Sequence, residues 1–118
     1  MLVSGGTFIF DLNTRKGLTR WNGVIVHPGD DIFYVNRSIY DEITIRAWTK
    51  ITGFVRDDAG RYDRFDETVY NTVFELEAVH QLLSETGFHQ IYCATGSDLT
   101  NPIDDPENEG RIFFVAQK

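Results

Sequence analysis

The sequence predicts an α+β fold, in which a mixed, mostly antiparallel sheet carries a long β-ribbon insertion and one main C-terminal helix. Residues 42–71 alternate apolar and polar side chains on both sides of a turn at residues 56–60, as the arms of a β-ribbon do. Residues 72–87 carry apolar side chains at helical spacing, and residues 111–116 form an apolar run typical of a strand.

A chain of 118 residues is long enough for one core and too short for two, so we expect a single domain. Residues 1–22 are assigned to the first strand and a short helix, residues 23–71 to the antiparallel β region, and residues 72–118 to the main helix and a closing β-hairpin.

The first strand is expected at residues 7–11, a continuous apolar run of the kind found in strands that are covered on both faces. Asn13 or Thr14 then caps a turn or two of helix that reaches to Trp21, although Gly17 weakens it. Strands are also predicted at residues 23–27 and 32–40, because the proline and glycine between them favour a turn.

The first arm of the ribbon predicts one core face and one mixed face. The core face carries Ile43, Ile45, Ala47, Ile51 and Val55, and the mixed face carries Thr44, Arg46, Trp48, Lys50, Thr52 and Phe54. A mixed face of this kind is either a half-exposed sheet surface, the cover of a ligand site, or a contact with a neighbouring chain.

Thr72 and Glu75 have the spacing of a capping box, which predicts that the main helix begins near Thr72. Gly87 is expected to end it, because glycine adopts the left-handed conformation that helix ends favour. Strands follow at residues 89–94 and 111–116. The acidic stretch between them, residues 96–110, does not have the spacing of an EF-hand and is expected to be a solvated hairpin loop.

Eleven basic and eighteen acidic residues give a net charge of -7, which argues against a nucleic acid or an anionic membrane as partner. The sequence has no long apolar run and no signal peptide at its start, so we expect a cytoplasmic protein.

Cys93 is the only cysteine and is expected to be a small buried side chain, not a nucleophile. His27, His80 and His89 lack the spacing of metal ligands, so no metal site is predicted.

No motif for catalysis stands alone in this sequence. It has neither a P-loop nor a dinucleotide-type glycine turn, and no nucleophile elbow. Asp66 and Glu67 are adjacent in a strand and therefore point to opposite faces, so they cannot form a dyad, although either could act as a single base.

The order of the segments carries more information than any one motif. Residues 5–14 read Gly-Gly-Thr-Phe-Ile-Phe-Asp-Leu-Asn-Thr, an aromatic-rich antiparallel insertion follows, the main helix ends in Thr-Gly-Phe, and the last strand reads Arg-Ile-Phe-Phe-Val-Ala-Gln-Lys. This order resembles the C-terminal half of class I S-adenosylmethionine-dependent methyltransferases of the small-molecule branch. The resemblance covers essentially the whole chain. It implies that the cofactor-binding N-terminal half is missing, that the chain alone is inactive, and that S-adenosylmethionine binds only if that half is supplied.

The resemblance also implies where the site lies. Asp11 and Asn13, at the carboxyl end of the first strand, and Trp48 are expected to bind substrate, and Glu67 and Tyr70 are expected to be catalytic. Relatives carry a histidine and an arginine just before the main helix, whereas this chain reads Glu-Thr-Val-Tyr-Asn-Thr at residues 67–72. Structural roles stay open for four of the five predicted site residues: a helix cap for Asp11, a surface ion pair for Glu67, and packing for Trp48 and Tyr70.

Two other functions remain open. The chain could be a non-enzymatic module that binds a small organic molecule in a pocket lined by Trp48, Tyr34, Tyr62 and Tyr70, or a structural subunit that pairs with a cofactor-binding chain. One helix can cover only one face of a sheet, and soluble monomers rarely expose a large apolar patch. We therefore expect a homo-oligomer or a cofactor-binding partner chain.

Overall fold

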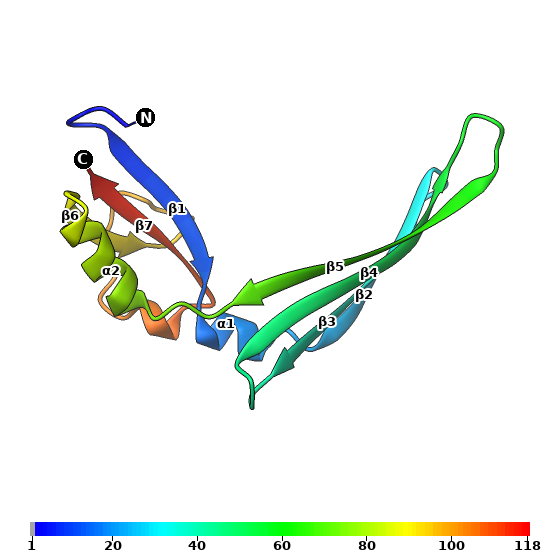
Figure 1. Cartoon of the computed structure of the whole chain (residues 1–118), viewed down its shortest axis with the longest axis horizontal. Coiled ribbons are helices and arrows are strands. Elements are labelled where there is room, and N and C mark those ends of the chain that lie inside the picture. The colour runs from blue at the N-terminus through cyan, green and yellow to red at the C-terminus, as the bar shows by residue number, and fades with distance from the viewer. Residues whose placement is uncertain (1) are drawn as a thin grey trace. The chain divides into compact units, whose positions relative to one another are not determined.

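The described residues, 2–118, form ten elements and two antiparallel sheets (Figure 1). A computed structural model describes residues 2–118. The elements are β1 (Thr7–Asn13), α1 (Arg15–Thr19), β2 (Gly23–His27), β3 (Ile32–Asp41), β4 (Arg46–Arg56), β5 (Tyr62–Thr72), α2 (Leu76–Glu85), β6 (His89–Ala94), the 3-10 helix η1 (Pro106–Asn108) and β7 (Arg111–Gln117). The predicted α+β class is confirmed.

The strands divide between two sheets, with the order β1-β7-β6 in one and β2-β3-β4-β5 in the other. All strand pairs within residues 2–118 are antiparallel, so the parallel component of the expected mixed sheet is not found there. The chain separates into two compact units: Met1–Leu18 with Val73–Lys118, and Thr19–Thr72. We call them the first and the second unit.

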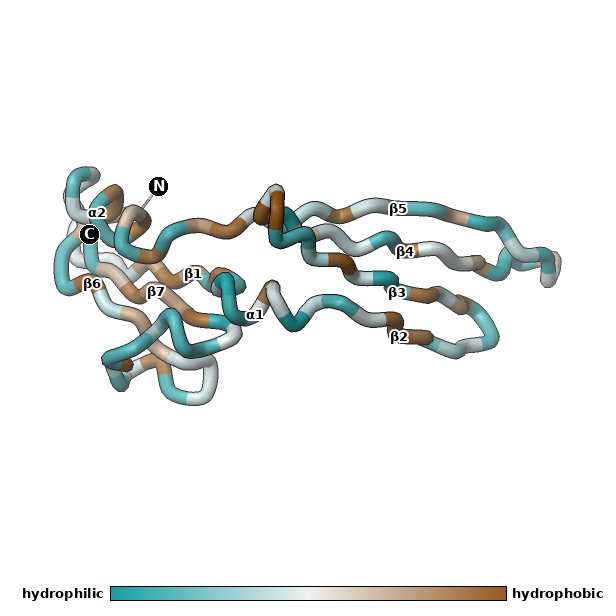
Figure 2. The backbone as a smooth tube through the Cα atoms, turned by 90° about the horizontal axis from the view of Figure 1, so that it is seen from below, coloured by the Kyte–Doolittle hydropathy of each residue, from teal (hydrophilic) through white to brown (hydrophobic). Residues whose placement is uncertain are grey.

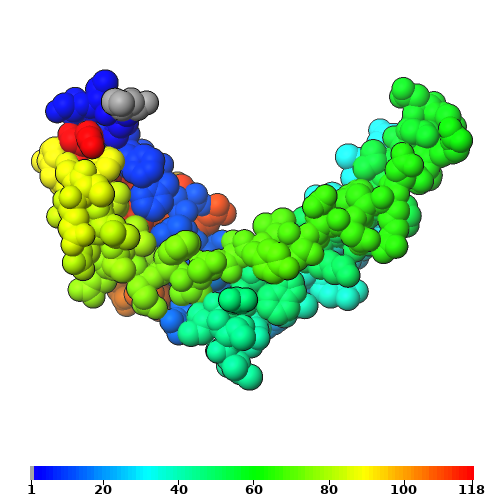
Figure 3. All heavy atoms as spheres, in the orientation of Figure 1, coloured from blue at the N-terminus to red at the C-terminus, as the bar shows by residue number. Residues whose placement is uncertain are grey.

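The core of the first unit lies between α2 and one face of the three-stranded sheet. β1 pairs with β7 from Thr7 opposite Gln117 to Asn13 opposite Arg111, which places alternate apolar residues on one face. The buried residues of this core are Leu76, Leu83, Ile112, Phe114 and Ala116, with Phe10 and Leu12 packed against them. Figure 3 shows the atoms of α2, in yellow-green, lying against β1, in blue.

The predicted start of the main helix is wrong. Thr72 is the last residue of β5, where it pairs with Arg46, and α2 begins at Leu76 with Glu75 as its N-cap residue. The Glu75 side chain makes no cap hydrogen bond and instead pairs with Arg15 at 3.0 Å. Thr72 lies four residues before the first helical residue, Leu76, which is too far for its side chain to cap α2.

The predicted end of the helix is confirmed. Gly87 has a φ of 96°, and its N–H donates to the Ser84 carbonyl at 3.2 Å. The Phe88 N–H donates to the Leu83 carbonyl at 3.0 Å. These two bonds form a Schellman motif, which satisfies carbonyls that the helix itself leaves without donors.

The acidic loop at residues 96–110 joins the antiparallel strands β6 and β7, as the predicted solvated hairpin loop does, and most of its residues are exposed, although several contact the first unit. The Tyr92 hydroxyl donates to the Leu99 carbonyl at 2.8 Å, and the Ile103 N–H donates to the Cys93 carbonyl at 2.9 Å. Ile103 packs against the core. At the start of the loop, a Cβ on Gly96 would lie 3.0 Å from the Phe113 ring. The loop therefore makes a few fixed contacts with the first unit, while most of its residues are exposed.

The short helix α1 is capped as predicted by one of the two candidates, Thr14. The Thr14 hydroxyl accepts the Gly17 N–H at 3.1 Å and donates to the carbonyl of Glu109. Thr14 is almost completely buried, with 1% of its surface exposed. This side chain therefore joins α1 to the segment before β7.

The second unit is a four-stranded meander whose centre is the predicted ribbon. β4 and β5 pair along their whole length, from Arg46 opposite Thr72 to Arg56 opposite Tyr62, and the ribbon is confirmed. Asp57 closes the turn, because its carboxylate accepts the N–H groups of Ala59 and Arg61 at 2.9 and 2.8 Å. The tube in Figure 2 shows apolar and polar positions along all four strands.

The predicted core face of the first arm is only partly correct. Ala47 is fully buried on that face, but Ile43 and Ile45 belong to the turn at residues 42–45 and not to a strand. Ile43 is 94% exposed and Ile45 has a φ of 54°. The Asp41 carboxylate organises this turn by accepting the Ile43 N–H at 2.9 Å, which ends the alternation that the sequence suggested.

Candidate functional site

Trp48 and Tyr70 are direct cross-strand partners on one face of the four-stranded sheet. We call this face the Trp48 face. The two rings line an open hollow of about 450 Å³, and Tyr70 is 74% exposed, so its ring is largely unused in packing. The residues that line the hollow are Asp41, Thr44, Arg46, Trp48, Lys50, Thr68 and Tyr70. Aromatic walls with nearby hydroxyl and charged groups are suited to a small organic ligand.

One charged group at the edge of this hollow is held in a fixed position. The Asp41 carboxylate accepts the Thr44 hydroxyl at 2.8 Å and the Ile43 N–H at 2.9 Å. Both hydrogen bonds favour the ionised form and therefore lower the pKa of Asp41 below its ordinary value, the Thr44 hydroxyl having the larger effect and the Ile43 N–H the smaller. Asp41 is therefore an anion at neutral pH.

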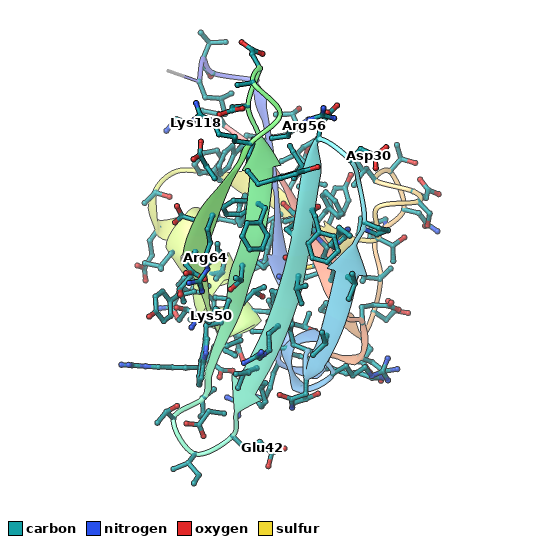
Figure 4. The ribbon with its side chains drawn as sticks, turned by 90° about the vertical axis from the view of Figure 1, so that its right-hand side faces the viewer. Asp30, Glu42, Lys50, Arg56, Arg64 and Lys118 are labelled. Carbon is teal, nitrogen blue, oxygen red and sulfur yellow. The ribbon has the colours of Figure 1, made fainter. Side chains whose placement is uncertain are left out.

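A second hollow, of about 370 Å³, lies farther along the Trp48 face and shares Lys50 with the first. Its lining residues are Phe33, Val35, Arg37, Lys50, Thr52, Phe54 and Arg64. Figure 4 labels Lys50 and Arg64, which come from neighbouring strands and lie on the same side of the sheet. The Trp48 face is thus both aromatic and cationic.

The two residues predicted to be catalytic do not share a face. Tyr70 lies opposite Trp48, whereas Glu67 lies opposite Ile51. An odd spacing of three residues in a strand sends the two side chains to opposite sides of the sheet. Glu67 is exposed, and no ion pair of Glu67 is found among residues 2–118, so the structural role considered for it is not seen there either.

Asp11 and Asn13 lie in the first unit, toward the end of β1. Asp11 forms an ion pair with Arg111 of β7, and Asn13 is the cross-strand partner of Arg111. Asp11 does not cap the following turn, because Thr14 does so. Asp11, Asn13 and Arg111 share one face of the three-stranded sheet.

The four aromatic residues considered for a binding module do not line one pocket. Tyr34 lies on the opposite face from Trp48 and stacks on His27, with ring centroids 4.2 Å apart. Tyr62 lies at the far end of β5 from Tyr70, where its hydroxyl donates to the Asp30 carbonyl at 3.1 Å. Of these four aromatic residues, only Trp48 and Tyr70 line the same hollow.

Neither Arg37 nor Arg64, which line the second hollow, is predicted as a site residue from the sequence. Arg37 lies on β3 directly opposite Lys50, which the sequence predicts on the mixed face of the ribbon. The register could have been found from the turn at residues 42–45, because its length fixes which residues of β3 and β4 face each other.

Cys93 lines a third hollow, of about 330 Å³, in the first unit. Burial, and to a lesser degree the nearby Glu107 carboxylate, raise the pKa of the Cys93 thiol to about 11. The thiol is therefore protonated at neutral pH and is not a nucleophile, in line with its predicted packing role.

Among residues 2–118, no three His, Cys, Asp or Glu side chains gather as a metal site would require. None of the helices described is long and apolar enough to cross a membrane.

Comparisons with known proteins identify what the chain is similar to. No protein-family model matches it. The whole chain is 36% identical over 120 residues to a protein of Geobacillus sp. (strain WCH70) that is named as a putative methyltransferase. It is 28% identical over 120 residues to the "Putative methyltransferase YqeM" of Bacillus subtilis (strain 168). The chain spans about half of these relatives, 47% of the length of each.

Two solved structures share the fold. A S-adenosylmethionine-dependent methyltransferase from Clostridium acetobutylicum ATCC 824 matches 98% of this chain and 46% of its own, with a TM-score of 0.68 and 22% identity. The sugar N-methyltransferase KedS8 from Streptoalloteichus sp ATCC 53650 matches 99% of this chain and 44% of its own, with a TM-score of 0.63 and 20% identity. The predicted resemblance to part of a methyltransferase is confirmed.

The hollows of the Trp48 face do not fit S-adenosylmethionine. Its sulfonium carries a positive charge, and Arg37, Arg46 and Lys50 line these hollows. Neither hollow is lined by a glycine turn that could offer a run of backbone N–H groups to a nucleotide.

Proposed function

We propose that this chain is the acceptor-binding part of a S-adenosylmethionine-dependent methyltransferase and that the methyl acceptor lies against the Trp48 face. The observation that carries the proposal is the similarity of the whole chain to about half of two proteins named as putative methyltransferases. The hollow between Trp48 and Tyr70 supports the choice of face, because it combines two aromatic walls with the hydroxyls of Thr44 and Thr68.

In this proposal the chain orients the acceptor and another segment or chain holds the cofactor. Methyl transfer depends largely on the placement of the acceptor's nucleophile against the methyl group, so a surface that fixes the acceptor contributes to the rate without touching the cofactor. Trp48 and Tyr70 enclose the acceptor, and the Tyr70 hydroxyl is available as a hydrogen-bond donor. Glu67 has no role at this hollow because it lies on the other face. Asp11 and Asn13 remain predicted ligand contacts in the first unit.

The 118-residue chain by itself is expected to be inactive. To test its role, this chain replaces the matched 120 residues of the Geobacillus relative, so that the rest of that protein completes it. The chimaera and the isolated chain are incubated with S-adenosylmethionine that is tritiated at the methyl group and with a small-molecule extract of cells. We expect methyl transfer by the chimaera and none by the isolated chain.

Variants of the chimaera test the face. Trp48→Ala and Tyr70→Ala are each expected to lower the rate at limiting acceptor by about tenfold or more, since an aromatic contact contributes about 1.5–3 kcal/mol. Binding of S-adenosylmethionine is expected to stay unchanged. Tyr62→Ala is the matched control, because Tyr62 lies on the same strand and face but at the other end. Methyl transfer by the isolated chain, or equal losses in the control, would contradict the proposal.

We also propose that a second chain covers part of the second unit, either as a homo-oligomer or as a cofactor-binding partner. β2 is an edge strand, and Val24, Ile25 and Val26 are each more than half exposed, on both of its faces. Exposed apolar edge strands are sites of association. If the chain is a homo-oligomer, light scattering of the purified chain is expected to give at least twice the mass of one chain. If it instead pairs with a cofactor-binding partner, the purified chain is expected to be a monomer whose measured mass rises when that partner is added. A monomer that never associates would argue against this.

A further inference from the structure

We propose that the hollow lined by Arg37, Lys50 and Arg64 binds the acidic group, a carboxylate or a phosphate, of a small organic molecule whose apolar part lies on Phe33 and Phe54. The site extends the proposed function, since the same molecule is taken to be the methyl acceptor. The anion site itself requires no cofactor and can be measured without one.

Two like charges face each other at the centre of this hollow. Arg37 of β3 and Lys50 of β4 are direct cross-strand partners, and like charges in such positions destabilise a sheet. Neither side chain has an ion-pair or hydrogen-bond partner among residues 2–118. A bound anion would attract both cations and would remove the repulsion between them.

The third cation of this hollow is Arg64, which forms an ion pair with a residue of its own strand, β5. Arg64 pairs with Asp66 at 3.0 Å, and the Thr52 hydroxyl donates to the same carboxylate at 2.7 Å. Asp66 neutralises one of the three cations, so the cluster keeps a net charge of about +2, counted from full side-chain ionisation at neutral pH. This local charge is opposite to the net charge of the chain, -7. Figure 4 shows Lys50 and Arg64 on neighbouring strands of this side of the sheet.

The apolar part of the ligand is indicated by the neighbouring aromatic pair. Phe33 and Phe54 are cross-strand partners on the same face and line the same hollow. They are 38% and 41% exposed. Covering such rings releases water from apolar surface, which favours a ligand with a ring or a hydrocarbon chain over a bare ion.

Lys50 also links this site to the hollow between Trp48 and Tyr70, since it lines both. An acidic group near Lys50 therefore leaves the rest of the same molecule within reach of Trp48. This shared residue is the reason for assigning the acidic group and the methyl-accepting group to one ligand.

The test is calorimetric titration of the full chain with three probes: phenyl phosphate, benzoate and inorganic phosphate. We expect phenyl phosphate or benzoate to bind at least several-fold more tightly than inorganic phosphate, and the tighter of the two identifies the acidic group. The binding should weaken as salt is raised, because exposed charges are screened. Failure of both aromatic probes to bind at millimolar concentration would overturn the proposal.

A double variant, Arg37→Gln with Lys50→Gln, is expected to lower the affinity at least tenfold. The control is Arg56→Gln with Arg61→Gln, which removes the same charge at the ribbon turn and is expected to change affinity less than twofold. Equal losses of affinity in the two double variants would mean that the ligand is attracted only by the net charge of the chain, and this result would overturn the proposed site. Without ligand, the Arg37 and Lys50 double variant should unfold at an equal or higher denaturant concentration, because it loses a repulsion. These titrations contain no S-adenosylmethionine, so their outcome is independent of whether methyl transfer is found.

Discussion

Thr14 is the residue that ties α1 to the distant segment before β7. Its buried hydroxyl accepts one N–H and donates to one carbonyl, so its loss would leave two polar groups without partners. We expect Thr14→Val to lower the free energy of unfolding by about 1–2 kcal/mol, measured by chemical denaturation with circular dichroism. Thr14→Ser keeps the hydroxyl and should lose well under half as much. Thr14→Val keeps the methyl group, so a loss in Thr14→Ser that is as large as or larger than the loss in Thr14→Val would show that the hydrogen bonds are not the main contribution of this side chain.

Cys93 gives a prediction of pH dependence. Burial raises the pKa of its thiol to about 11, from an ordinary value of 9.0. The folded chain therefore holds this proton more tightly than the unfolded chain, so this group makes the folded chain less stable as pH rises from about 9 to 11.

The measurement for Cys93 is the rate of alkylation by iodoacetamide as a function of pH. Because Cys93 is the only cysteine, the reaction reports on a single thiol. We expect a half-maximal rate near pH 11 in the folded chain and near pH 9 in denaturant. A half-maximal rate near pH 9 in the folded chain would contradict the burial of this thiol.

For single residues, the sequence predicted those roles that depend only on residues nearby in the chain. The cap at Thr14 and the left-handed Gly87 follow from residues within one turn of helix. The ion pair of Asp11 with Arg111 could not be found in this way, because it depends on the pairing of β1 with β7 across most of the chain.

Among the elements, β4 contains Gly53, whose backbone leaves no room for a side chain. A Cβ on Gly53 would lie 2.4 Å from the Phe33 carbonyl oxygen and 2.6 Å from the Tyr34 Cβ. These neighbours belong to the adjacent strand and cannot move away without breaking the ladder. We expect Gly53→Ala to lower the stability of the second unit by about 1–3 kcal/mol.

Gly23→Ala is the matched control for Gly53→Ala. Gly23 also lies in a strand of the same sheet, but a Cβ there meets nothing within 4 Å. It should change stability by about 0.5 kcal/mol or less. Both tryptophans, Trp21 and Trp48, lie in the second unit, so tryptophan fluorescence during denaturation measures the two variants directly. If both variants lose equal stability, the close approach at Gly53 is not the cause.

At the scale of elements, the sequence predicted all seven strands and the main helix to within a few residues at most boundaries. The start of α2 was misplaced because Thr72 completes the β5 ladder, and a ladder partner on another strand is invisible in a local pattern. The same limit applies to Ile43 and Ile45. Their apolar alternation continues into a turn that the Asp41 carboxylate holds.

For the whole molecule, composition and local charge point to different partners. A net charge of -7 predicts repulsion of anions, yet the Trp48 face gathers Arg37, Lys50 and Arg64 around one hollow. The sequence predicted that Trp48 and Tyr70 belong to the site, and the structure brings them together. It did not predict the cationic hollow, because that depends on the register between β3 and β4.

We propose that this chain contributes the acceptor side of a methyltransferase and does not hold the cofactor by itself. The most direct test is calorimetric titration of S-adenosylmethionine and S-adenosylhomocysteine into the purified 118-residue chain, with its mass determined on the same sample by light scattering. We predict no binding of either compound at concentrations up to about 1 mM, a limit that corresponds to about -4 kcal/mol of binding free energy. Binding at micromolar strength, by a monomer or by an oligomer, would show that this chain builds a cofactor site of its own and would contradict the claim.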